Sequence, residues 1–220
     1  MVDFKPLEAA PVALRSPLHG TSPVTTVSAS GVTRGVVIAE QPAGLVIQII
    51  ARRGKASETV AALRTHFALA ASDGPARCVK NGVVLVGAGP GQWLLMADAA
   101  DGAAIETKAK AVLADVATLA DQSHARVRLH ISGPRARDAL AKLVGIDLDT
   151  SVFAAGAAAM TVIAHIPVHI WRLDDIPEGA VFEIAAPHSY AASLWHYVVT
   201  AAAEFGLDAR SLDPMSSGPH

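Results

Sequence analysis

The order of the expected elements is the feature of this 220-residue sequence that most constrains its fold. Between residues 44 and 132, hydrophobic periodicity predicts a strand, a helix, two strands, a helix and a strand. From residue 124 to 205 it predicts a strand, a helix, two strands and a helix. This is the split βαβ order of ferredoxin-like units. We therefore expect an α+β fold of two ferredoxin-like βαββα units, with antiparallel-rich sheets covered by helices.

Runs of β-branched or alternating residues mark the expected strands, and apolar stripes mark the helices. The expected strands span residues 34–41, 44–51, 81–89, 92–98, 124–132, 159–173 and 179–186. The expected helices span residues 57–69, 103–119 and 189–205, with one more between Gly133 and Gly145. Pro42 and Gly44 separate the first two strands, so these strands are expected to flank a turn.

Four segments are expected along the chain. The prolines of residues 1–31, with no sustained hydrophobic period, predict an extended N-terminal arm. Residues 32–120 are expected to form the first α+β unit and residues 121–210 the second. Residues 211–220 are expected to be a flexible tail.

Composition excludes several classes of protein. Hydrophobic residues make up 51% of the chain, which is enough for a sizeable core. The 18 Lys and Arg residues and the 20 Asp and Glu residues nearly balance, so no nucleic-acid partner is expected. A single cysteine, Cys78, excludes an internal disulfide and a multi-cysteine zinc site. Without a membrane-length apolar run or a basic, apolar leader, we expect no membrane association and a cytoplasmic location.

Two short motifs are better explained by structure than by chemistry. GAGPG at 87–91 is expected to be a hairpin turn, because a strand-like segment follows it and Pro90 has no N–H for a phosphate. Asp121, Ser123 and His124 are close in sequence, but adjacency is not the geometry of a catalytic triad. We expect the first two to bond the backbone, and we assign no catalytic residue.

The segment 159–173 supplies candidate contact residues. If it is one uninterrupted strand, His165 and His169 share a face and lie about 13 Å apart, too far to bind one metal ion. Together with Trp171 they form a face that is either solvated or in contact with a partner. We favour contact, since Trp is enriched at interfaces. The even-numbered positions from Val162 to Ile170 then face the core.

The segments 124–132 and 189–205 carry further signals. In the first, three charged positions alternate with three apolar positions, as in a half-buried strand. The charged positions are Arg126, Arg128 and His130. The helix at 189–205 is apolar nearly all round, which indicates burial on more than one side. Tyr190 and Trp195 therefore either join His165, His169 and Trp171 as interface candidates or belong to a helix in the core of a single domain.

Six stretches, in order between residues 15 and 208, together resemble the gamma subunit of heterotetrameric sarcosine oxidase. They are RSPLHG (15–20), ARRGKASE (51–58), GPGQWLLMAD (89–98), DQSHARVRLHISGPRARDALAKLVGIDL (121–148), AHIPVHIWRL (164–173) and HSYAASLWHYVVTAAAEFG (188–206). Related complexes that oxidise other N-methyl amino acids, such as N-methylglutamate dehydrogenase, have subunits of the same kind.

The segment 121–136 is also similar to part of the folate-dependent aminomethyltransferases, which implies a related fold for the second half. Those enzymes carry a glycine-rich acidic turn, with a functional carboxylate, in a later hairpin. The expected corresponding segment, 162–173, has neither glycine nor acid. Asp174 and Asp175 are expected to follow the strand rather than to form the turn.

The resemblance implies a non-catalytic structural subunit of a complex that demethylates sarcosine oxidatively to glycine. It implies alpha, beta and delta subunits as partners. The larger ones would hold FAD, FMN, NAD and tetrahydrofolate, and the smallest would hold zinc. We expect no cofactor and no metal on this chain, and no activity from the isolated chain. The alternatives are a folate-binding aminomethyltransferase-like protein, the equivalent subunit of a related dehydrogenase, and a general ligand-binding α+β protein.

Overall fold

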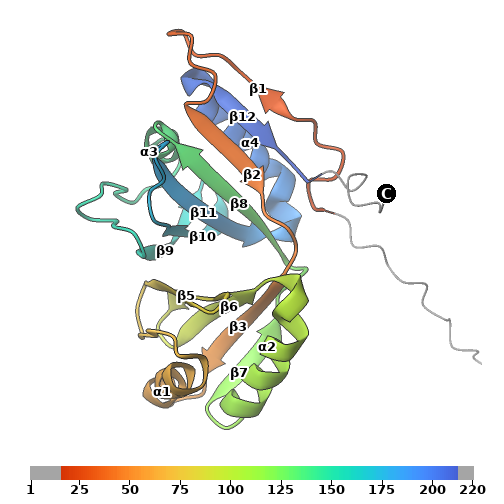
Figure 1. Cartoon of the computed structure of the whole chain (residues 1–220), viewed down its shortest axis with the longest axis vertical. Coiled ribbons are helices and arrows are strands. Elements are labelled where there is room, and N and C mark those ends of the chain that lie inside the picture. Colours follow the sequence, from red (N-terminus) through yellow and green to blue (C-terminus); the bar gives the residue numbers. More distant parts are fainter. Residues whose placement is uncertain (1–15, 213–220) are drawn as a thin grey trace, which may run out of the picture.

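The computed structural model describes residues 16–212 and contains two β-sheets with a pair of helices against each (Figure 1). One sheet has seven strands in the order β1-β12-β2-β8-β11-β10-β9. The other has five strands in the order β4-β5-β6-β3-β7. The five-stranded sheet contains the ferredoxin-like strand order, and in the seven-stranded sheet β2 is inserted into that order between β8 and β12. The predicted α+β fold with two antiparallel-rich sheets covered by helices is confirmed.

The five-stranded sheet is antiparallel throughout. Its strands are β3 (Leu45–Ala51), β4 (Arg77–Lys80), β5 (Val83–Gly89), β6 (Gln92–Ala97) and β7 (Ala117–Asp121). Its helices are α1 (Ala56–Phe67) and α2 (Ala99–Leu113). Leu63 of α1 and Leu113 of α2 are fully buried in one apolar cluster with this sheet, so both helices cover the same face.

The seven-stranded sheet is antiparallel except where β12 pairs with β2. Its strands are β1 (Val24–Thr25), β2 (Val36–Glu40), β8 (Arg126–Gly133), β9 (Ala158–Ile163), β10 (Ile166–Arg172), β11 (Ala180–Pro187) and β12 (Leu207–Arg210). Its helices are α3 (Ala136–Ala141) and α4 (Ala191–Ala202), with short 3₁₀ turns at His188–Tyr190 and Ala203–Phe205. Leu140 of α3 and Leu194 of α4 are buried on the same face of the sheet.

The first two strands do not form the predicted local pair. β2 lies between β12 and β8 in the seven-stranded sheet, whereas β3 pairs with β6 and β7 in the other. The Pro42–Gly44 segment therefore crosses between the sheets. Gly44 is required there, because a Cβ atom would lie 2.6 Å from the carbonyl oxygen of Ala97. The division into units at 32–120 and 121–210 stays a prediction, but β2 pairs with the sheet of the second range.

The strand that closes the first unit also differs from prediction. The expected helix at 103–119 ends at Leu113, and β7 follows from Ala117. Val116 and Leu119 continue the helical spacing of the apolar residues, so the periodicity alone extended the helix too far. The segment 124–132 was assigned to both units, and it belongs to the seven-stranded sheet as β8.

The predicted long strand at 159–173 is a hairpin. β9 and β10 pair tightly around Ala164 and His165, and Ala164 has a positive φ of 54°. No Gly, Pro or Asn marks this turn, so the sequence pattern missed it. The turn also reverses the inward face of β9: Ile163 is fully buried, whereas Val162 is 52% exposed and was wrongly placed in the core.

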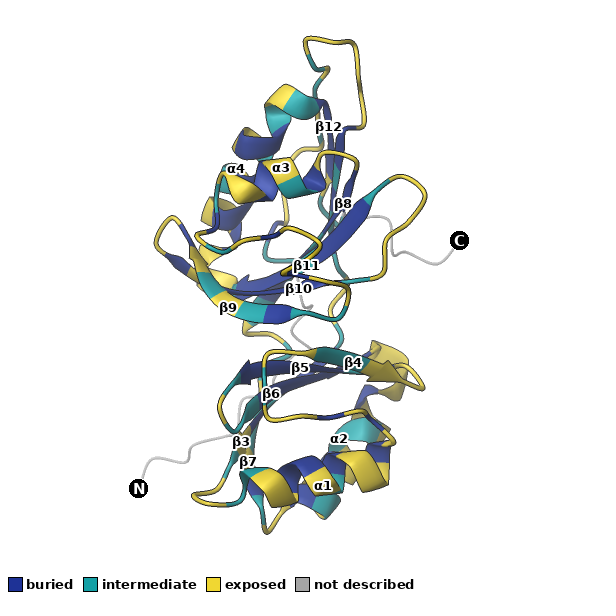
Figure 2. Cartoon of the chain, turned by 90° about the vertical axis from the view of Figure 1, so that its left-hand side faces the viewer, coloured by how far each residue is buried: buried dark blue, intermediate teal, exposed yellow. Residues whose placement is uncertain are grey.

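The two sheets pack against each other through the faces that carry no helices (Figure 2). Trp171 and Ala185 of the seven-stranded sheet meet apolar side chains of β3, β5 and β6 in a separate buried cluster. Backbone hydrogen bonds extend this contact, from Arg77 N to Gly156 O at 2.7 Å and from Ala158 N to Pro75 O at 3.0 Å. The order is therefore helices, sheet, sheet, helices.

The ends of the described chain are packed on the seven-stranded sheet. Leu18 is 1% exposed in the core, and Ser16 Oγ donates to Glu40 Oε1 at 2.6 Å. Of the predicted arm, residues 16–31 thus contribute core contacts and β1, and residues 1–15 lie outside the described range. Within the predicted tail, Leu212 N donates to Glu40 Oε2, and residues 213–220 lie outside the range. Of the helices in the described chain, none has the length and apolar character needed to cross a membrane.

Candidate functional site

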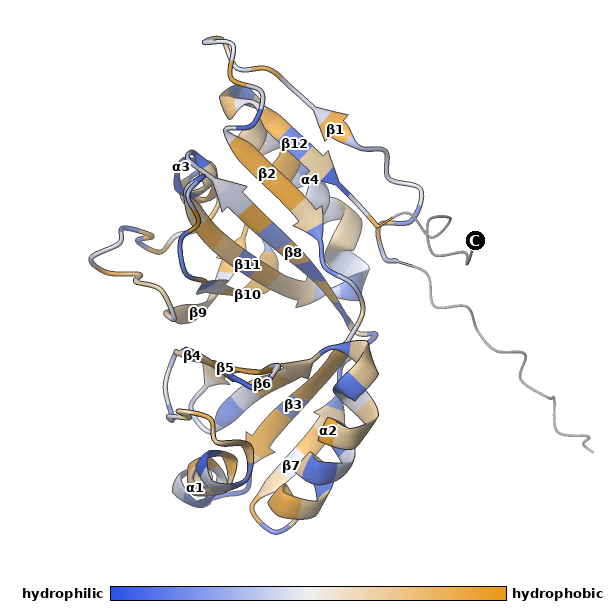
Figure 3. Cartoon of the chain, viewed as in Figure 1, coloured by the Kyte–Doolittle hydropathy of each residue, from blue (hydrophilic) through white to orange (hydrophobic). Residues whose placement is uncertain are grey.

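The helix-free face of the seven-stranded sheet carries a band of polar side chains, because β8 alternates as the sequence predicted. Its hydrophobic positions are buried in the core and alternate with half-buried hydrophilic positions, and hydrophobic and hydrophilic colours alternate along the strand (Figure 3). Across the strands, Trp171 is opposite Glu183, and Glu183 is opposite His130. Residues directly opposite one another on paired strands share a face. The three side chains therefore form one row on the face that meets the five-stranded sheet.

Glu183 is the central carboxylate of this row. Its Oε2 accepts a 2.9 Å hydrogen bond from Trp171 Nε1, and its Oε1 lies 3.9 Å from His130 Nδ1. Burial raises the pKa of Glu183, but the pairing with His130 and the positive charge of Arg128 outweigh it, so the pKa lies below its ordinary value. The ionised carboxylate holds the indole of Trp171 in place between the sheets.

The neighbouring row places His169 opposite Ala185, and Ala185 opposite Arg128. His169 is only 9% exposed, and its Nδ1 has no hydrogen-bond partner. Burial first, and then the charge of Arg126, lower its pKa from 6.5 to about 4. Arg126 itself is half-buried, its Nε is shielded and unpaired, and burial lowers its pKa. The second row is therefore neutral at His169 and positively charged at Arg128, and Arg126 adds a positive charge in the next row, opposite Pro187.

Acidification is expected to destabilise the chain through His169. The folded pKa of about 4 lies below the ordinary 6.5, so the unfolded chain binds the proton more tightly. The free energy of unfolding therefore keeps its full value above pH 6.5. It decreases by about 2–3 kcal/mol as the pH falls toward 4. Denaturant unfolding near pH 7 and near pH 4.5 measures the loss. His169→Gln should lose correspondingly less, and an unchanged pH dependence in that variant would contradict the assignment.

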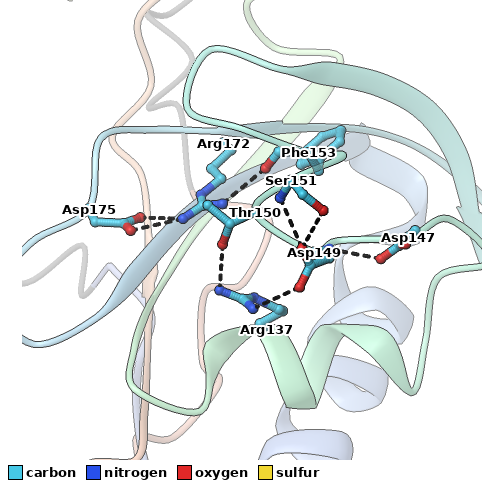
Figure 4. Close-up of polar contacts among 8 residues, drawn as sticks. All are labelled: Arg137, Asp147, Asp149, Thr150, Ser151, Phe153, Arg172 and Asp175. Carbon is cyan, nitrogen blue, oxygen red and sulfur yellow. Dashed lines mark hydrogen bonds and ion pairs between the residues drawn. The ribbon is translucent and has the colours of Figure 1, made fainter.

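A second polar cluster surrounds Arg172, whose side chain is almost completely buried (Figure 4). Arg172 Nη1 donates to the carbonyl of Phe153 at 3.0 Å, and Nη2 donates to both carboxylate oxygens of Asp175 at 2.8 Å. The backbone of Arg172 also bonds Gly156 and Ala157. These bonds fasten the loop before β9 to the start of the β10–β11 turn.

The same loop is held at its other end by Arg137 of α3. Arg137 Nη2 donates to Thr150 Oγ1 at 2.9 Å, and Nη1 lies 3.6 Å from Asp149 Oδ2 (Figure 4). Asp149 Oδ1 accepts from both the backbone N and the hydroxyl of Ser151, and these bonds lower its pKa. Both arginines are thus neutralised within the chain, which indicates a structural role for this cluster.

An open hollow beside β1 and β12 contains two arginines and one carboxylate. It is lined by Thr25, Thr33, Arg34, Asp208 and Arg210. Asp208 Oδ2 lies 3.2 Å from Arg34 and 3.0 Å from Arg210, whose Nε also donates to Asp208 Oδ1. The carboxylate is therefore shared by both guanidinium groups, and neither is left without a counter-charge.

The structure separates the five predicted contact residues. Trp171 is fully buried between the sheets, and Trp195 is 5% exposed in the core, so neither side chain is available to a partner. His169 is buried as well. His165 lies exposed at the β9–β10 turn, with its ring centroid 6.3 Å from that of Tyr190, which is 36% exposed. A contact role for His165 and Tyr190 stays a prediction.

The short motifs take the expected structural roles. Pro90 and Gly91 form the turn between β5 and β6, so the hairpin prediction for GAGPG is confirmed. Asp121 Oδ1 accepts from the backbone N and hydroxyl of Ser123, which lowers its pKa, and Ser123 Oγ accepts from Val46 N. This confirms the backbone-bonding role. Between residues 16 and 212, no three His, Cys, Asp or Glu side chains gather closely enough to hold a metal ion.

Asp174 and Asp175 follow β10, as expected, in the segment that leads to β11. The tight turn of this connection comes after them, where Ile176 and Gly179 form an isolated bridge. Both carboxylate oxygens of Asp175 accept hydrogen bonds from Arg172 Nη2, and the Asp175 side chain is 53% exposed.

Comparison with known protein families assigns most of this chain to one of them. The sequence profile of the GCVT N-terminal domain matches residues 74–217, more than half of the chain. This chain belongs to the GCVT N-terminal domain family. The matched range includes Arg126, His169 and Glu183, so the polar face belongs to the part shared with the family.

Two solved structures show the same GCVT-like fold. A chain of the heterotetrameric sarcosine oxidase from Corynebacterium sp. U-96, in complex with pyrrole 2-carboxylate, is 24% identical with a TM-score of 0.69. The match covers 82% of this chain and 89% of that one. Glycine cleavage system aminomethyltransferase T from Bartonella henselae is 15% identical with a TM-score of 0.58, and the match covers 48% of its chain. A comparison with curated protein sequences gave no match.

Arg126 and Glu183 are the residues that sequence reasoning missed as members of a site. The signal for Arg126 was present, since a strand with charged residues at alternating positions exposes one polar face. Nothing local to Glu183 indicated that its carboxylate would meet Trp171 and His130. That arrangement depends on the register among β8, β10 and β11.

Proposed function

We propose that this chain is the gamma-type, non-catalytic subunit of a heterotetrameric sarcosine oxidase. The observation that carries the proposal is the near end-to-end match with one chain of such an enzyme, 82% of this chain against 89% of that one. The aminomethyltransferase match instead covers only 48% of the larger protein. A chain of this size thus corresponds to a whole subunit in the first case and to about half of an enzyme in the second.

The polar clusters support a structural role. Glu183 holds Trp171, Arg172 fastens the loop before β9, and Asp121 orders the chain after β7. Each carboxylate has a partner that explains it without a substrate. Catalysis in the complex would come from flavins held by other subunits, since flavins supply the redox chemistry that amino-acid side chains lack.

The proposal extends to partners and location. The partners are alpha, beta and delta subunits, which hold FAD, FMN, NAD, tetrahydrofolate and zinc in the assembled, cytoplasmic complex. No cofactor or metal is assigned to this chain. Engagement of Asp175 by Arg172 supports this for folate, because a pterin would have to displace the buried guanidinium of Arg172 from the Asp175 carboxylate.

The experiment is a sarcosine oxidation assay on the isolated chain and on the complex purified around it. The isolated chain, supplied with FAD and FMN, should show no turnover, whereas the complex should convert sarcosine to glycine. Turnover by the isolated chain would contradict the non-catalytic assignment. A complex that is inactive with sarcosine but oxidises another N-methyl amino acid would indicate the equivalent subunit of a related dehydrogenase instead.

A further inference from the structure

Arg126 is a half-buried positive charge with no counter-charge in the described part of the chain. Its Nε is shielded from solvent without a hydrogen-bond partner, as are the Nε atoms of Arg77, Arg137 and Arg172, and burial lowers the pKa of Arg126. Arg137, Arg172 and Arg210 each pair with an aspartate. Between residues 16 and 212 no carboxylate lies within ion-pair distance of Arg126. A charge removed from water without a partner costs free energy, so this position indicates a missing anion.

The carboxylates of Glu183 and Asp121 are already engaged. Glu183 interacts with His130, Arg128 and Trp171, two rows further into the sheet contact. Asp121 is bonded twice by Ser123 at the end of β7. Neither is free to neutralise Arg126.

The surroundings of Arg126 combine this charge with apolar surface. Arg126 is opposite Pro187 on β11, and at the sheet edge Val162 is opposite Pro167. These pairs lie beyond the His169–Ala185 pair, at the end of the sheet where the buried cluster with the other sheet stops. We name as the Arg126 patch the residues Arg126, Met160, Val162, Pro167, His169 and Pro187.

The exposure of apolar side chains within the Arg126 patch favours a ligand with an apolar part. Met160 is 66% exposed and Val162 is 52% exposed, although both are large apolar side chains on an edge strand. His169 is buried beside them with Nδ1 unpartnered, so one more polar group awaits a hydrogen bond. Arginine suits a carboxylate best, because its planar fork can donate two parallel hydrogen bonds.

We propose that the Arg126 patch docks an acidic side chain of a partner subunit, with an apolar residue beside it that packs on Val162 and Met160. The partner in this statement rests on the proposed function. The negative charge expected of the ligand does not rest on the proposed function, since it follows from Arg126 having no counter-charge in the described part of the chain. A free small carboxylate and a second copy of this chain are the competing occupants.

The first arm of the test uses the full chain and hexanoate as a probe, followed by NMR. Hexanoate should shift the signals of His169 and Val162 saturably, whereas hexanol should not, because it has the apolar chain without the charge. Arg126→Gln should weaken hexanoate binding about tenfold or more. Arg34→Gln changes an exposed arginine beside β12, toward the sheet edge opposite β9, and should leave hexanoate binding unchanged. The melting temperature of Arg126→Gln should equal or exceed that of the wild type, since a desolvated charge is removed.

The second arm identifies the source of the carboxylate. In the complex assembled around this chain, Arg126→Glu should weaken subunit assembly about tenfold or more, and Arg34→Glu should not. Normal assembly of Arg126→Glu with the wild-type partners would overturn the docking inference and leave the proposed function intact. If the wild type gathers no partner chains, or only copies of itself, the partner named here is wrong. If hexanoate does not bind, or binds equally well to Arg126→Gln, the inference that the Arg126 patch takes a carboxylate is overturned.

Discussion

Trp171→Ala is expected to destabilise the isolated chain by about 3–5 kcal/mol. The indole is fully buried in the cluster that joins the two sheets, and its Nε1 donates to Glu183. Truncation removes the largest apolar contact between the sheets and leaves a half-buried carboxylate without its donor. The loss should appear without any partner present, because every contact of Trp171 lies within this chain.

Urea unfolding of the isolated chain measures the effect of Trp171→Ala. Tyr190→Ala is the matched control, since Tyr190 is an aromatic residue that is 36% exposed and should cost little. A Trp171→Ala chain that folds with wild-type stability but no longer assembles would contradict the structure. It would restore the partner-contact face that the sequence suggested for this residue.

Ile166→Ala is expected to cost about 2–5 kcal/mol by opening a cavity, while Val162→Ala should stay within about 0.5 kcal/mol. Ile166 is fully buried at the start of β10, and Val162 is 52% exposed near the end of β9. An uninterrupted strand would place both side chains on one face. The hairpin at Ala164 and His165 separates them.

Thermal and urea unfolding of the two variants distinguish these arrangements. Unequal losses, with Ile166→Ala far the larger, support the β9–β10 hairpin. Similar losses of several kcal/mol would mean that both residues are in the core and that the segment continues without a turn.

The architecture was predictable because its signals are local. The order strand, helix, strand, strand, helix occurs two times along the chain. The apolar stripes of the helices α1 and α4 correctly predicted Leu63 and Leu194 as core residues. The Pro90–Gly91 turn was readable because glycine and proline mark turns.

Long-range pairing was not predictable by the same means. β2 reads as half of a local hairpin, yet its partners β8 and β12 lie far along the chain. The β9–β10 turn uses Ala164 in a left-handed conformation, which residue type does not suggest. Because a hidden turn changes which side chains face inward, one missed turn also misplaced Val162.

The candidate site was predictable only in part. Charges on alternate positions of β8 indicated a polar face, and Arg126 lies on it. The burial of His169 and Trp171 results from the packing of a second sheet on that face, and no strand pattern reveals which sheet covers which. Trp171 was therefore predicted to contact another chain, whereas it contacts the five-stranded sheet of its own chain.

The most direct test of the proposed subunit role is purification of the tagged full-length chain from its native source, with identification and stoichiometry of every chain that accompanies it. We predict three other chains in fixed ratio, bound flavin, and conversion of sarcosine to glycine by the purified assembly. A chain that purifies alone, or an assembly that contains no flavin-binding partner, would contradict the proposed function.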